Sequence, residues 1–181
     1  MSLSGWTVLA LVALLVFWAL GAYNRLVGLR QAIAAAWQQV HTLLRQRGDA
    51  VAPLVGALRE PLAAESASLD ALLSAQAQVT AAADALGARP ALPELAGAMA
   101  KAEQAMTASS SRVLALLELS PALAGDERVA PHLATLKDTM TGLAFARQLF
   151  NDAAQRYDEA IAQFPTRLLT GLFGFGAAGR I

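Results

Sequence analysis

The sequence of 181 residues contains no cysteine, few charged residues and a net charge of zero. Without cysteine, the chain has no disulfide, no thiolate ligand for zinc, no cysteine nucleophile and no cysteine to carry a lipid. Charged residues make up 15% of the chain and apolar residues 56%, which excludes a disordered protein. A balance of 14 basic and 14 acidic residues also argues against a nucleic-acid partner, because nucleic-acid binders are usually basic.

β-Branched residues are scarce as well. Valine and isoleucine together number 13, whereas alanine and leucine number 73. Sheets are rich in β-branched and aromatic residues, and alanine and leucine are the strongest helix formers. The composition therefore predicts an all-α protein.

The first 24 residues carry no charge at all. Within them, the segment from Gly5 to Ala22 has one threonine as its only polar side chain, and as a helix it is about 27 Å long. This length is close to the hydrocarbon thickness of a bilayer. Trp6 lies near one end, and Trp18 and Tyr23 lie near the other, where aromatic rings prefer the membrane interface. We expect a transmembrane anchor over residues 1–23.

Two other interpretations of this segment are weaker. A cleaved signal peptide needs a basic start and a shorter apolar run, and a core helix of this length needs a polar face.

The residues after the segment suggest its orientation in the membrane. Four arginines precede the first acidic residue, Asp49; they are Arg25, Arg30, Arg45 and Arg47. The positive-inside rule then places the rest of the chain in the cytoplasm and the N-terminus outside, in what we take to be a bacterial inner membrane.

The remaining chain has apolar residues at heptad spacing in four stretches. Connectors are expected at Glu60–Pro61, at 87–93 and at 120–126, and Pro53 is expected to kink the first stretch. The longest series runs at steps of seven through Val129, Leu136, Leu143, Phe150, Tyr157 and Phe164. Short connectors make neighbouring helices antiparallel. We therefore expect the anchor to continue into an antiparallel up-and-down bundle of about four long helices over residues 24–165, followed by an apolar, glycine-containing tail over 166–181.

Both ends of the chain resemble the LemA family. The matching segments are Tyr23-Asn24-Arg25-Leu26-Val27, Ala36-Trp37-Gln38-Gln39-Val40, Ala144-Phe145-Ala146-Arg147, Phe150-Asn151-Asp152-Ala153, Tyr157-Asp158-Glu159-Ala160-Ile161, Phe164-Pro165 and Gly171-Leu172-Phe173-Gly174-Phe175. The middle, roughly 60–130, matches only as Ala/Leu-rich helix. The resemblance implies a single-pass membrane protein with a helical domain, and it supplies no mechanism.

Catalytic and metal-binding patterns are nearly absent from the sequence. His41 and His132 stand alone, without a second ligand three or four residues away. A cation site from Asp152, Asp158 and Glu159 is less favoured than a solvated helix face. Residues 174–179 match G-x-G-x-x-G, but a dinucleotide site needs a strand before this pattern and a helix after it. We therefore predict no catalytic residue, no cofactor and no metal.

Two arginines occupy positions within the apolar heptad series. We call these seam positions, because neighbouring helices should meet along them. A buried unpaired charge is unfavourable, so Arg47 and Arg147 should each pair or extend to the bundle edge. Both lie at similar heights above the membrane. We expect either a shared polar layer with Asp49 and Asp152 or two arginines at the rim.

The tail is the second candidate membrane contact. An even number of antiparallel helices returns the chain to the membrane after Pro165, and the apolar residues that follow are Leu168, Leu169, Leu172, Phe173 and Phe175. The alternatives are that the tail folds back over the bundle end or docks a partner.

Taken together, these features favour a non-enzymatic, membrane-anchored scaffold that binds the lipid bilayer and a protein partner. A second copy of the chain is one candidate for that partner. The alternative is a signal-relay module, in which the membrane helix passes a motion into the bundle.

Overall fold

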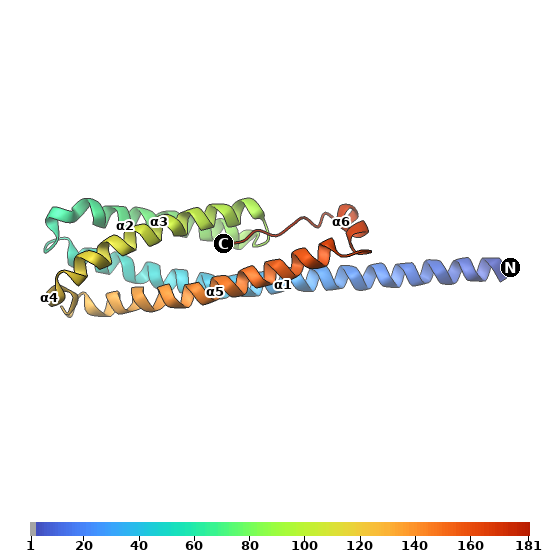
Figure 1. The fold of residues 1–181 in the computed structure, drawn as a ribbon, viewed down its shortest axis with the longest axis horizontal. Coiled ribbons are helices and arrows are strands. Elements are labelled where there is room, and N and C mark those ends of the chain that lie inside the picture. Colours follow the sequence, from blue (N-terminus) through green and yellow to red (C-terminus); the bar gives the residue numbers. More distant parts are fainter. Residues whose placement is uncertain (1–2) are drawn as a thin grey trace.

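The computed structural model describes residues 3–181, with side chains from Trp6 onward except at positions 169 and 172. Over this range the chain forms helices and no strand. The first helix, α1 (Leu3–Leu58), has 56 residues, which corresponds to about 84 Å. Its N-terminal part projects far beyond the rest of the molecule, and its C-terminal part belongs to a bundle (Figure 1).

Three further long helices complete the bundle: α2 (Ser66–Ala88), α3 (Pro93–Glu118) and α5 (Ala130–Ala162). Helix α5 lies along α1 (Figure 1), and α2 packs against both α1 and α3. Short helical turns stand between or after them, namely η1 (Ala63–Glu65), α4 (Pro121–Ala124) and α6 (Arg167–Phe173). The predicted all-α, up-and-down architecture is confirmed.

The helix boundaries follow the proline signals in the sequence. Helices α3 and α4 begin with Pro93 and Pro121, and Pro131 lies in the first turn of α5. Proline suits a first turn because its missing N–H would have no partner there. Helix α1 continues through Pro53 to Leu58. Pro53 and Asp49 lie on the exposed face of α1, where water can satisfy the carbonyl that proline leaves unpaired.

The seam residues form the bundle core. The largest of them, Trp37, Phe150 and Tyr157, are at most 1% exposed, and the Trp37 and Phe150 rings meet edge to face with centroids 6.0 Å apart. Each such aromatic contributes on the order of 2 kcal/mol through burial. One seam position was predicted wrongly: Phe164 is 77% exposed. Helix α5 ends at Ala162 and the backbone is extended at Gln163, so Phe164 no longer follows the helical face.

Candidate functional site

The two halves of α1 have different surroundings. From Trp6 to Leu20, every large apolar side chain except that of Trp18 is 51% to 74% exposed, whereas the seam residues from Leu26 onward are buried. The most apolar window of α1 has a mean hydropathy of 2.1, and none of it is buried against the protein. Soluble proteins rarely expose so large an apolar surface. This part of α1, which contains Gly5 and ends near the half-buried Trp18 and Ala22, is long and apolar enough to cross a membrane.

Helix α6 lies where α1 leaves the bundle. The ring centroid of Phe173 is 5.3 Å from that of Tyr23, just beyond the apolar segment. Phe173 is 50% exposed and Leu168 is 61% exposed. Both side chains are exposed, and their contact with a membrane stays a prediction. The side chains of Leu169 and Leu172 lie outside the described part of the structure.

Beyond α6 the tail folds back onto the bundle, as Figure 1 shows. Asn151 donates its Nδ2–H to the carbonyl of Ile181 at 2.8 Å and accepts the N–H of Ile181 at 2.9 Å. Asp158 accepts the backbone N–H of Ala178 at 2.7 Å. Phe175 is only 8% exposed, so its predicted membrane contact is wrong. The tail divides into an exposed apolar helix and a segment docked on α5.

Two glycines of the 174–179 pattern have structural roles. Gly174 ends α6 with a φ of 65°, a left-handed conformation that glycine adopts readily. Gly179 lies against the start of α3, where an added Cβ would stand 2.4 Å from the Cβ of Ala96. The glycines thus serve the turn and the docking of the tail.

The buried arginine of α1 has a partner that sequence reasoning missed. Arg47 and Glu103 of α3 are 3% and 4% exposed. Arg47 donates to both carboxylate oxygens of Glu103, with a separation of 3.2 Å for the Nη1–Oε2 pair. The Nε of Arg47 is buried and has no hydrogen-bond partner among the residues that the structure describes. The two residues form a bidentate ion pair inside the bundle.

The sequence predicted a polar layer of Arg47, Asp49, Arg147 and Asp152. The prediction is wrong for the two aspartates. Asp49 and Asp152 are exposed, because each lies on the solvent face of its helix. Arg147 is half-buried and lines a cavity of about 420 Å³ together with Glu103. Glu103 pairs with Arg47 and lines the same cavity as Arg147.

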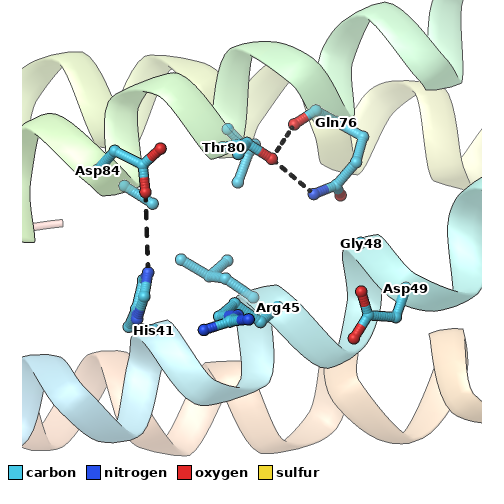
Figure 2. A pocket seen from close by; sticks show the side chains of 10 residues that line it. His41, Arg45, Gly48, Asp49, Gln76, Thr80 and Asp84 are labelled. Carbon is cyan, nitrogen blue, oxygen red and sulfur yellow. Dashed lines mark hydrogen bonds and ion pairs between the residues drawn. The ribbon is translucent and has the colours of Figure 1, made fainter.

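A polar groove of about 320 Å³ runs between α1 and α2 (Figure 2). His41 Nε2 stands 4.0 Å from Asp84 Oδ1, longer than a hydrogen bond, so the contact is an ion pair only when His41 is protonated. Thr80 donates its hydroxyl to the carbonyl of Gln76 at 3.0 Å. Gln76 Oε1 is buried and accepts no hydrogen bond from the described part of the chain, and the side-chain amide nitrogen of Gln76 faces Gly48. The groove offers groups for polar recognition.

The other candidate side chains have local roles. Within residues 3–181, the structure brings no three histidines or acids close enough to hold a metal ion. Asp158 also pairs with Arg180 at 3.2 Å, and Glu159 accepts a hydrogen bond from Gln155. Asp158 is therefore engaged by the tail.

Comparison with known protein families gives one match. No curated protein matches the sequence. The sequence model of the LemA family matches residues 36–179, which include the bundle-forming part of α1 from Ala36 onward, the other long helices and most of the tail. The chain belongs to the LemA family.

Proposed function

We propose that this protein is a membrane-anchored helical scaffold without catalytic activity, which presents its bundle to a protein partner in the cytoplasm. One observation carries the proposal: α1 is a single helix whose first half exposes an apolar surface and whose second half forms the bundle core. An uninterrupted helix holds the bundle at a fixed place relative to the bilayer. The arginines that follow the apolar segment support the cytoplasmic orientation.

The bundle surface supports a protein partner. Most large apolar side chains of the bundle are buried, but Phe145 on α5 is 65% exposed and Leu119 after α3 is 82% exposed. Exposed aromatic residues are enriched in protein interfaces. Phe145 is far from the apolar segment in sequence and lies in the middle of α5.

Membrane retention tests the anchor. Arginine at the centre of a membrane helix is unfavourable by about 3 kcal/mol. The double substitution Leu14→Arg and Leu15→Arg should therefore release the chain from membranes washed with carbonate. The matched control is Leu119→Arg, which adds charge at an exposed site outside the segment. Retention of the double variant would contradict the anchor.

Photo-crosslinking tests the scaffold role. A benzophenone amino acid at Phe145 should capture one recurrent protein in intact membranes, which mass spectrometry identifies. The same group at Ser74, an exposed position on α2, should not capture it. Identical products from both positions would contradict a specific partner surface.

The second candidate function is signal relay. The uninterrupted course of α1 favours it, because a rotation or tilt of the apolar half reaches the bundle core directly. Relay predicts that crosslinks from the bundle change with growth conditions, whereas a static scaffold predicts constant products.

A further inference from the structure

A pocket lies between the α2–α3 turn and the tail segment that follows α6. Its volume is about 530 Å³, and its walls are the 89–93 turn and the 174–177 segment, with Arg30 of α1 closing one side. Two arginines, Arg30 and Arg89, are the only charged residues among those that line it. The rest of the wall is proline, alanine, leucine and glycine. The pocket is thus apolar with two positive charges.

Aromatic rings hold Arg30 in place. Its Nε–H donates to the hydroxyl of Tyr157 at 3.2 Å, and its guanidinium lies 4.7 Å from the ring centroid of Phe175. A guanidinium that is already stacked loses little freedom when it binds an anion. Its other contact is a long one, 3.5 Å from Nη2 to the carbonyl of Gly174. Donors of Arg30 therefore remain available to a ligand in the pocket.

Neither arginine is neutralised by the protein. Among the described residues, no carboxylate lies within 4.0 Å of the guanidinium of Arg30 or Arg89. The backbone N–H groups of Gly176 and Ala177, in the same wall, have no hydrogen-bond partner in the described chain. Two cations and free backbone donors around one pocket are complementary to a phosphate group.

The pocket also lies close to the predicted membrane surface. Arg30 is eight residues beyond Ala22, or about 12 Å along α1. The headgroup layer occupies about 5–8 Å beyond the hydrocarbon, and side chains on a helix point back toward its N-terminus. Helix α6 contacts Tyr23 through Phe173 and ends at Gly174, which lines the pocket.

We propose that this pocket binds the phosphate diester headgroup of an anionic phospholipid. Arg30 and Arg89 contact the phosphate, and the apolar wall takes the glycerol backbone and the start of the acyl chains. The inference rests on the proposed membrane anchor, because the anchor brings the pocket to the headgroups. Bound lipid would fix the α2–α3 end of the bundle to the bilayer at a second point.

Native mass spectrometry of the full chain in mild detergent tests the site. The probes are phosphatidylglycerol and phosphatidylcholine in equal amounts, with millimolar inorganic phosphate as competitor. The test variant is Arg89→Gln, because Arg89 is exposed and its side chain forms no ion pair with the described residues. The matched control is Arg112→Gln, which removes an exposed arginine of α3 far from the pocket in sequence.

The wild-type chain should bind phosphatidylglycerol in preference to phosphatidylcholine. Arg89→Gln should weaken that binding about fivefold, as expected for one arginine near an anionic headgroup, and Arg112→Gln should leave it unchanged. Equal losses in both variants, or no loss in either, would overturn the proposal. Displacement of the lipid by inorganic phosphate would assign the site to a free anion and overturn it too. Carbonate release of the wild-type chain would refute the anchor alone, because the detergent measurement does not depend on it.

Discussion

The ion pair between Arg47 and Glu103 gives the sharpest prediction about stability. Both side chains are nearly inaccessible, 4% and 5% exposed, and they are joined by two charge-assisted hydrogen bonds. The substitution Glu103→Leu removes the acid and leaves the guanidinium buried without a counter-charge. The structure places no other carboxylate within 4.0 Å of Arg47 in the described chain.

The expected loss follows from that burial. Removing one partner of a buried ion pair reduces the free energy of unfolding by about 3–5 kcal/mol. This is a large share of the roughly 5–15 kcal/mol that stabilises a typical domain. The double substitution Arg47→Met and Glu103→Leu should recover most of the loss, because it buries no charge. It also removes the unpaired Nε of Arg47, whose desolvation is unfavourable in the native protein.

Urea unfolding of the full chain in mild detergent, followed by far-UV circular dichroism, measures these differences. The control pair is Arg59–Asp70, which is 54% and 59% exposed, so Arg59→Met should reduce stability by less than about 1 kcal/mol. Two results would refute the reasoning. One is a loss of less than about 1 kcal/mol for Glu103→Leu, which is the value of an exposed pair. The other is a double variant whose loss of unfolding free energy equals the sum of the losses in the two single variants.

Three further predictions concern single positions. Gly56→Ala should raise the free energy of unfolding by about 0.5–1 kcal/mol in urea titration, because Gly56 is within α1 and an added Cβ meets nothing within 4 Å. Gly179→Ala should lower it by about 1–3 kcal/mol and increase hydrogen exchange of the tail, since its Cβ has no room. The backbone N–H of Arg128, followed by its side chain, lowers the pKa of Asp126. Asp126→Asn should therefore destabilise the protein near neutral pH. The difference in stability between wild type and variant should disappear as the pH falls through the lowered pKa of Asp126, which thermal unfolding at a series of pH values would measure.

Much of the helical architecture could be predicted from local sequence. The uncharged start of the chain, the heptad spacing and the proline-containing connectors depend only on neighbouring residues. The connector predicted at 87–93 lies between α2, which ends at Ala88, and α3, which begins at Pro93. The heptad series predicts that Phe150 and Tyr157 face the core, and both are buried.

The contacts between distant elements could not be predicted in this way. Arg47 and Glu103 are 56 positions apart, and heptad spacing shows which face of a helix is buried without showing which helix covers it. For a similar reason, the docking of the tail on the bundle could be predicted only as one alternative to membrane contact. Asn151 and Asp158 resemble ordinary solvated residues of α5, and their role depends on a chain end that returns to them.

Sided labelling of single cysteines tests the membrane-spanning topology most directly. The chain has no native cysteine, so Ser4→Cys and Ser74→Cys each introduce a unique thiol at the two ends of the proposed arrangement. In intact cells, a maleimide that does not cross the inner membrane should label Ser4→Cys and should label Ser74→Cys only after the membrane is opened. Labelling of both thiols, or of neither, in intact cells would contradict an α1 that spans the membrane with its bundle inside.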